Sequence, residues 1–395
     1  MAQVLLHSVL PEASSEEYAP FQSVDFLILA PGRKLVRNSI RIEGDIYARK
    51  DTTSGWLPTA VPANPPPACS AVDFDSNVKI CNQIGAHAFF DSFSCETQSR
   101  GVLENLQNYG RHCKMVASST LAADDLNTSK FIAEGRGPME INGNYVLQPV
   151  VDQAFLSGTD FEQWSQRSPG QFSIAPQVCF NRSQGGEYAF DANGFIRVSC
   201  ILAANSDALF GGNGAGGANY VLKNLNCRYV TTADDGVSQP IMMRSYVNVV
   251  SSIQSTATTV SARVPSTQVN AVSVSFAKQS NVNSTEFSSV ALETLPQWDN
   301  ISYLFSNTMS NAVTYVIKDR GDAIQKGIES LDNAGHQQVS ARTLKGNDGN
   351  IMGLAFNEFL DLTSQKFTMN FNLLSDTITA APMNAYLYFS TIISM

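Results

Sequence analysis

Segment 35–46, LVRNSIRIEGDI, alternates between the two faces of an extended chain along its whole length. One face is mainly apolar and holds Val36, Asn38, Ile40, Ile42, Gly44 and Ile46. The opposite face is mainly polar and holds Leu35, Arg37, Ser39, Arg41, Glu43 and Asp45. A period of two over this length is typical of a β-strand with one buried face and one solvent-facing face. The segment therefore predicts a β-architecture.

Most other apolar segments are also predicted to be strands, because they are short and bounded by turn residues such as Pro31 and Gly32. The predicted strands are 26–30, 84–93, 172–180, 195–202, 220–230, 247–253, 269–276, 367–373 and 386–393. Two segments, 97–116 and 322–331, show helical spacing of their apolar residues instead. The proline-dense segment 51–70 is predicted to be a loop, because proline is excluded from central strands.

The two halves of the chain share a weak repeat. Segment 195–202, FIRVSCIL, aligns with 367–374, FTMNFNLL, and a closing strand follows each one after a polar loop. The repeat predicts two copies of one β-sandwich, joined through the polar segment 231–245. The expected divisions of the chain are an N-terminal arm over 1–20, a first sandwich over 21–232 and a second sandwich over 233–395.

Composition narrows the classes of function. A chain of 395 residues can form two ordinary domains. Only 15% of its residues are charged, its net charge is −9, and it contains no run of Lys and Arg. Binding to a nucleic-acid backbone normally needs a basic patch, so direct nucleic-acid binding is not expected.

The cysteines do not predict a metal site. There are seven, which are Cys69, Cys81, Cys95, Cys113, Cys179, Cys200 and Cys227. Their number is odd and no C-x-x-C spacing occurs, so we expect reduced thiols packed as small apolar side chains.

The first residues lack the pattern of a secretory signal, and no apolar run approaches the roughly 20 residues that span a bilayer. We therefore expect synthesis in the cytoplasm, and the glycosylation sequons at Asn127, Asn181, Asn283 and Asn300 are interpreted as incidental.

Two motifs resemble ligand-binding loops but lack the required context. Segment 212–217 contains G-x-G-x-x-G, yet the following residues are predicted to form a strand, whereas a dinucleotide loop opens a helix. We interpret it as a surface loop. Three acidic turns lack the alternating spacing of a calcium loop. These turns are Asp124-Asp125, Asp234-Asp235 and Asn347-Asp348-Gly349.

No catalytic constellation is recognisable. The histidines at positions 7, 87, 112 and 336 are scattered, and His87 is expected to be a packed or hydrogen-bonded strand residue. Glu134, Glu140 and Asp152 could supply a glycosidase carboxylate pair, but sequence spacing does not report their spatial separation. We predict no catalytic, cofactor-binding or metal-binding residues, no cofactor and no enzymatic activity.

This pattern resembles the double jelly-roll major capsid proteins of the adenovirus and tectivirus lineage, including those of virophages and polinton-like viruses. The residues that carry the resemblance are LVRNSIRIEGDI and the closing strand pairs within 195–230 and 367–393. Helical segments within 97–116 and 297–331, one in each half, also fit. The resemblance implies a mainly β fold with two tandem eight-stranded jelly-roll sandwiches, long loops and short inserted helices.

The resemblance also implies a function and partners. The chain would be a viral structural protein whose homotrimers form pseudo-hexagonal capsomers of an icosahedral shell. Its partners would be neighbouring capsomers, minor capsid or cement proteins and, in some particles, an internal membrane. It would be located in the virion capsid after synthesis in the host cytoplasm.

Two other readings remain open at this point. One is a minor or vertex (penton) capsid protein. The other is a carbohydrate-binding β-sandwich at a surface, which exposed aromatic residues such as Trp164 or Trp298 would support.

Overall fold

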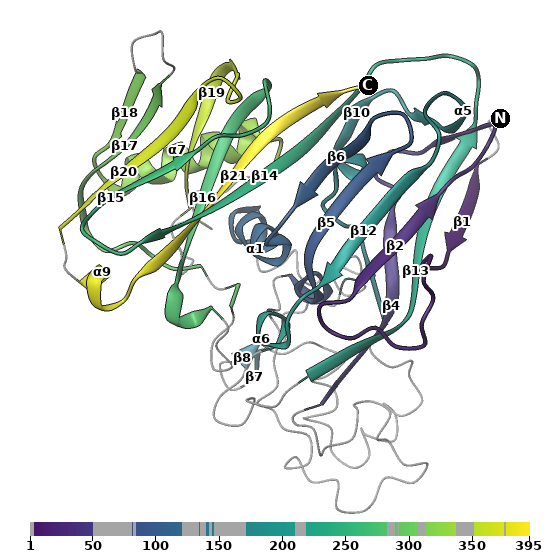
Figure 1. Ribbon diagram of the computed structural model, residues 1–395, viewed down its shortest axis with the longest axis horizontal. Coiled ribbons are helices and arrows are strands. Elements are labelled where there is room, and N and C mark those ends of the chain that lie inside the picture. Colours follow the sequence, from purple (N-terminus) through teal and green to yellow (C-terminus); the bar gives the residue numbers. More distant parts are fainter. Residues whose placement is uncertain are drawn as a thin grey trace, which may run out of the picture. The chain divides into compact units, whose positions relative to one another are not determined.

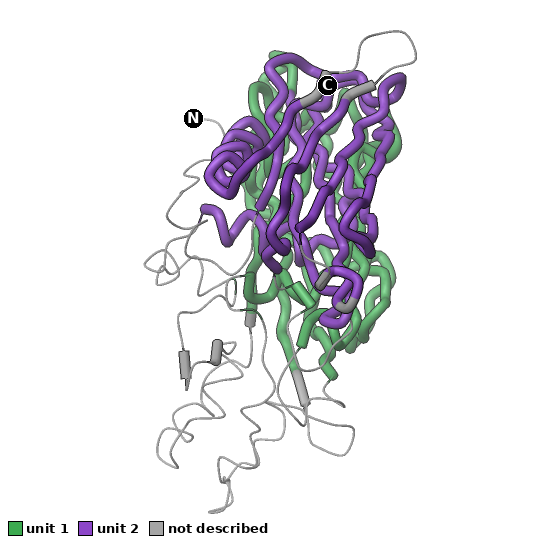
Figure 2. Tube along the Cα trace, turned by 90° about the vertical axis from the view of Figure 1, so that its left-hand side faces the viewer, with its two compact units in different colours: residues 1–105, 122–241, 283–290 green, residues 106–121, 242–282, 291–395 purple. Residues whose placement is uncertain are grey.

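In the computed structural model, the chain forms two compact units (Figure 2). Unit 1 comprises residues 1–105, 122–241 and 283–290, and unit 2 comprises 106–121, 242–282 and 291–395. The structure describes residues 4–49, 81, 84–120, 134, 140–141, 144–145, 171–209, 219–282, 289–290, 292–306, 313–336, 351–374 and 377–395. None of the helices in these ranges has the length and apolar character needed to cross a membrane.

Unit 1 contains two antiparallel sheets (Figure 1). The first contains β1 (Leu5–Val9), β3 (Arg33–Leu35), β4 (Arg41–Arg49), β9 (Gln171–Ile174), β11 (Tyr188–Ala189) and β13 (Asn219–Ala233). In it, β13 pairs with β1 on one side and with β3 and β4 on the other. The second sheet has the order β2 (Ser23–Ile28), β12 (Ile196–Leu202), β5 (Phe90–Thr97), β6 (Gly101–Leu106).

The chain of unit 1 passes repeatedly from one sheet to the other. It runs from β1 in the first sheet to β2 in the second, then through β3 and β4, β5 and β6, β9 and β11, β12 and β13 in the same alternation. The aromatic rings of Phe90 on β5 and Phe172 on β9 lie 6.3 Å apart, so the two sheets pack face to face. Alternation of this kind between two packed sheets is the winding of a jelly roll.

Segment 35–46 forms two strands and not one. The chain leaves β3 at Leu35 and enters β4 at Arg41, and between them Asn38 has a φ of 56°. Asparagine tolerates this left-handed conformation, which interrupts the extended chain. Ile40 and Ile42 are fully buried, so the predicted apolar face of the segment is confirmed at these positions.

Unit 2 also contains two antiparallel sheets (Figure 1). The strands of unit 2 in the first sheet have the order β14 (Ile241–Ile253), β21 (Met383–Ser394), β16 (Val269–Lys278), β19 (Met352–Leu360). The second has the order β15 (Ala257–Ala262), β20 (Lys366–Leu373), β17 (Trp298–Ser306), β18 (Val313–Ile317). The ring of Phe367 on β20 lies 5.4 Å from that of Phe389 on β21, so these two sheets also enclose an apolar core.

The two units have the same winding. In unit 2 the chain again alternates between sheets, through β14, β15, β16, β17–β18, β19, β20 and β21. The aligned segments 195–202 and 367–374 coincide with β12 and β20, which hold the same place in this order. Their closing strands are β13 and β21. The predicted repeat is therefore confirmed, and the fold is mainly β with two jelly-roll sandwiches.

A helix follows the equivalent strand in each half of the chain. Helix α1 (Tyr109–Thr120) follows β6, and helix α7 (Arg320–Asn333) follows β18. The predicted helix 322–331 is confirmed within α7. The predicted helix 97–116 is wrong in its first half, which forms β6. Glu104 is buried in β6, so a charged residue stands at a position where the alternation of a strand would place an apolar one.

Several short elements complete the described chain. They are η1 (Gly85–Phe89), β7 (Glu140–Ile141), β8 (Asn144–Tyr145), η3 (Cys179–Arg182), β10 (Ser183–Gly185), α5 (Phe190–Asn193), α6 (Asn205–Ala208), η5 (Gln279–Asn281) and α9 (Thr377–Ala380). The predicted strands 84–93 and 172–180 therefore each contain a 3-10 turn as well as a strand. The predicted loop 51–70 lies outside the described residues.

Residues 1–20 were expected to be an arm, and the structure places β1 within them. Leu5 to Val9 pair with Cys227 to Thr231 of β13, and Tyr18 forms an isolated bridge with Leu222. Strand β1 lies at the end of its sheet and leaves Leu5 and Leu6 exposed. A strand at such an edge lacks the alternation of burial that identifies strands in sequence.

Candidate functional site

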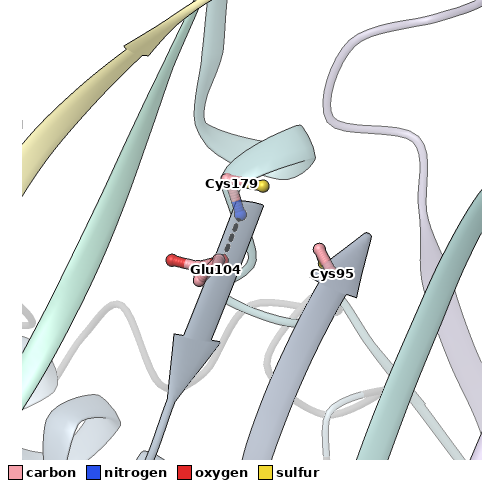
Figure 3. Close-up of side chains that lie close together, drawn as sticks. All are labelled: Cys95, Glu104 and Cys179. Atoms are coloured by element: carbon pink, nitrogen blue, oxygen red, sulfur yellow. Dashed lines mark hydrogen bonds between the residues drawn. The ribbon is translucent and has the colours of Figure 1, made fainter. Parts of the chain in front are cut away.

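A cluster of chemically reactive side chains lies inside unit 1 (Figure 3). It brings together Cys95 from β5, Glu104 from β6 and Cys179 from η3. The two sulfur atoms and a carboxylate oxygen all lie within 4.8 Å of one another. The cysteines are fully buried, and Glu104 is 2% exposed. Neighbouring strands supply two of the residues, and the third comes from a turn distant in the sequence.

Arg182 balances the buried charge of Glu104. Its guanidinium donates to Oε1 of Glu104, while the backbone N–H of Cys179 donates to Oε2 over 2.6 Å. Both donors belong to η3, so the carboxylate fixes this turn against β6. Burial, followed by the hydrogen bond with Cys95, raises the pKa of the Cys179 thiol. The cluster therefore holds a protonated Cys179 thiol beside a carboxylate whose charge Arg182 compensates.

A second buried cluster holds helix α1 within unit 2. The ring of His112 on α1 is fully buried and lies 4.4 Å from the ring of Tyr246 on β14 and 5.1 Å from that of Tyr388 on β21. The hydroxyl of Tyr246 shares a 2.6 Å hydrogen bond with Nε2 of His336, and Tyr388 donates to the Asn108 carbonyl over 3.1 Å. These contacts attach α1 to the β14–β21 pair.

Exposed apolar side chains gather at strand edges within each unit. In unit 1, β1 and its flanks expose Val4, Leu5, Leu6 and Leu10, with Leu6 at 60% exposure. In unit 2, the edge strand β18 exposes Tyr315 and Val316. Among the described strands, β1 pairs only with β13 and β18 only with β17. Exposed edges of this kind are typical contact surfaces between protein molecules.

Three of the candidates from the sequence, His87, Asp234 and Asp235, contact charged partners within unit 1. His87 lies in η1, is fully buried, and its Nε2 lies 3.7 Å from Oε2 of the buried Glu134. It is therefore packed as predicted, but in a 3-10 turn and not in a strand. Asp234 and Asp235 both form ion pairs with Lys34. Lys34 therefore offsets one of the two carboxylate charges and holds both side chains within a turn.

The other candidates do not assemble into a site in the part of the chain that the structure describes. The loop 212–217, the acidic turns at 124–125 and 347–349, Asp152 and Trp164 all lie outside that part. Glu140 begins β7, where only the backbone is described. Trp298 packs against the core of unit 2, so it does not form an exposed aromatic platform for a sugar.

Sequence reasoning did not identify the cluster of Cys95, Glu104 and Cys179. Metal sites are recognised in sequence by short ligand spacings, and here a whole turn and several strands separate Cys179 from the other two residues. Glu104 is the only acidic residue of segment 101–110, GVLENLQNYG, and this alone does not indicate a metal site.

Comparison with solved structures identifies the fold. The Faustovirus major capsid protein superposes with a TM-score of 0.59 at 9% sequence identity, over 100% of this chain and 90% of that protein. VP54 of PBCV-1, fitted into a cryo-EM reconstruction of the virophage Sputnik, gives a TM-score of 0.58 at 9% identity, over 100% of this chain and 95% of that one. No family model and no curated protein matches the sequence. The likeness is thus one of fold, the double jelly roll.

Proposed function

We propose that this chain is the major capsid subunit of a virus, and that three copies form a pseudo-hexagonal capsomer of an icosahedral shell. The observation that carries the proposal is the repeated jelly-roll winding of units 1 and 2. It is supported by the likeness of fold, over the whole chain, to two viral capsid proteins. Three copies of a subunit with two similar sandwiches present six similar modules, which is the basis of a pseudo-hexagonal outline.

The chemistry of the described surface suits assembly. Apolar side chains are exposed along β1 and β18, whereas the sequence carries few charges and no basic run. Contacts between copies that repeat around a closed symmetric shell are individually weak and collectively strong. The edge strands β1 and β18 are the proposed contact regions, and β1 would join neighbouring capsomers.

The proposed role is structural and not catalytic. The carboxylates of Glu104, Asp234 and Asp235 are held by Arg182 or Lys34 inside ion pairs, which suits stabilisation of turns. The negative net charge suits a shell protein that leaves genome packaging to other components. Minor capsid proteins, cement proteins or an internal membrane would then line the shell, and the virion would be the protein's location.

The solution mass of the purified full chain tests the proposal. Light scattering coupled to size exclusion is expected to give three times the 42.8 kDa of one chain, over a wide range of protein concentrations. A species that remains monomeric at high concentration would overturn the capsomer. A stable dimer or pentamer would assign the chain to a different place in a shell, with the pentamer indicating a vertex protein.

A further inference from the structure

The buried cluster of unit 1 has the donor set of a metal site. Cys95 and Cys179 offer two sulfur atoms, and Glu104 offers a carboxylate (Figure 3). Magnesium and calcium select oxygen ligands, whereas zinc combines cysteine sulfur with histidine nitrogen or carboxylate oxygen. The chemistry of the set therefore points to a thiophilic divalent cation.

The distances permit such an ion after a small contraction. Zinc lies about 2.3 Å from cysteine sulfur and about 2.0–2.2 Å from carboxylate oxygen, so tetrahedral ligand atoms are roughly 3.4–3.8 Å apart. The three ligand atoms here lie within 4.8 Å of one another. Rotation of the cysteine side chains can provide the difference of about 1 Å without moving the strands.

The carboxylate can bind an ion and keep its present partners. Each oxygen of an ionised carboxylate has two lone-pair positions, and Arg182 and the Cys179 N–H use one on each oxygen of Glu104. The free position on the oxygen nearest the sulfurs allows Glu104 to bind through one oxygen, which gives three protein ligands with the two sulfurs. Arg182 would then act as the outer partner that orients the ligand.

Charge balance favours the same ion. Without metal, the charges of Arg182 and Glu104 form a neutral pair. With a divalent cation and two thiolates, the charges of the ion, the thiolates, Glu104 and Arg182 again sum to zero. A buried site that stays neutral avoids the large penalty for an isolated charge in an apolar interior.

We propose that Cys95, Cys179 and Glu104 form a structural Zn²⁺ site that ties β5, β6 and η3 together inside unit 1. On binding, each thiol releases one proton to solvent, two zinc–sulfur bonds form, and the carboxylate replaces water on the ion. No electron is transferred. The site is independent of the proposed capsid role, since it concerns the interior of one subunit.

Metal content of the full chain tests the site. The protein is expressed in zinc-supplemented medium without a metal-affinity tag and purified without chelator. Native mass spectrometry and elemental analysis are expected to give one Zn²⁺ per folded chain. Replacement by Co²⁺ is expected to produce the absorption of thiolate-to-metal charge transfer, which reports sulfur ligation directly.

Variants assign the ligands. The double variant Cys95→Ser with Cys179→Ser is expected to lose at least ten-fold in bound zinc. Cys200→Ser is the matched control, because Cys200 is also buried in unit 1 but lies outside the cluster, and it should keep full zinc content. If the double variant does not fold, the cobalt spectrum of the unmodified chain still shows whether cysteine sulfur binds the metal.

Three outcomes would overturn the site. The first is a folded chain that holds no zinc and takes up none from excess Zn²⁺ under reducing conditions. The second is a cobalt protein without sulfur charge transfer. The third is a disulfide between Cys95 and Cys179 in protein purified under reducing conditions, seen in peptide mass spectra as the loss of two hydrogens, which would assign the pair to oxidation.

Discussion

The side-chain hydroxyls of Ser273 and Ser330 lie 3.1 Å apart and share a buried hydrogen bond. Ser273 belongs to β16 and Ser330 to α7, so the bond fixes the helix on the outer face of the sheet. Small residues make this approach possible. A Cβ atom added to Gly353 on β19 would lie 2.0 Å from Oγ of Ser330. Residues that alternate as a polar face in the sequence of β16 are therefore buried under a helix.

Gly327→Ala is expected to destabilise the protein, although alanine normally favours a helix over glycine by about 1 kcal/mol. A Cβ atom at Gly327 would lie 2.6 Å from the carbonyl oxygen of Ile351, and this backbone atom cannot move away easily. Overpacking of this kind costs about 1–3 kcal/mol. Chemical denaturation measures the change, with the exposed helix position Gln325→Ala as the control near zero. A stabilised Gly327→Ala variant would refute the close contact.

Glu104→Gln should lower the free energy of unfolding by about 3–5 kcal/mol, because it removes the carboxylate that balances the buried charge of Arg182. Urea denaturation monitored by fluorescence gives the value. Adding Arg182→Gln to this variant should restore part of the loss, since both charges are then absent. If Glu104→Gln unfolds at the same urea concentration as the original chain, the ion pair contributes little.

Acidification is expected to loosen β1. His7 stacks on Tyr229 with ring centroids 4.8 Å apart, and its Nε2 lies 2.8 Å from Oγ1 of Thr231. Burial, with a smaller contribution from Arg33, lowers the pKa of His7 below its ordinary value of 6.5. Above pH 6.5 the docked strand keeps its full stability. As the pH falls below 6.5, His7 is protonated more readily in the detached strand than in the docked strand, so docking weakens. The weakening stops once the pH is below the lowered pKa that His7 has in the docked strand.

Hydrogen exchange of residues 5–9 at about pH 5 and about pH 7.5, corrected for intrinsic rates, measures this effect of His7. Protection should be lower at the acidic pH. His7→Gln keeps a polar side chain without a titrating group, so its protection should not depend on pH. Equal pH dependence in both proteins would place the titrating group elsewhere.

Leu6→Asp combined with Leu10→Asp is expected to prevent association between capsomers while leaving each capsomer folded. Leu6 and Leu10 are 60% and 68% exposed, so charges there do not disturb the core of unit 1. Sedimentation velocity at rising protein concentration measures the association. Leu6→Val with Leu10→Val keeps the surface apolar and serves as the control. Unchanged association of the aspartate variant would exclude β1 as the contact between capsomers.

The sequence predicts the fold where apolar period and secondary structure agree. Segments 195–202 and 367–374 alternate cleanly, lie in equivalent strands, and reveal the repeat of the two sandwiches. The jelly-roll architecture and the closing strands follow from them. Ile40 and Ile42 are buried as their alternation predicts.

Other features depend on tertiary contacts, which the spacing of apolar residues in the sequence does not predict. The turn at Asn38 divides segment 35–46, because Ser39 donates to the Val36 carbonyl over 2.6 Å in place of strand pairing. Glu104 faces inward only because Arg182, far along the chain, compensates it. The cluster with Cys95 and Cys179 was therefore beyond sequence reasoning, since its members meet only in the folded unit.

Negative-stain electron microscopy of the purified chain tests the proposed capsomer most directly. Class averages are expected to show particles with a pseudo-hexagonal outline, in which three copies of two similar sandwiches form six lobes. At high protein concentration, these particles should also associate side by side into sheets. Averages that show single two-lobed molecules, or rings with another symmetry, would contradict the trimeric capsomer.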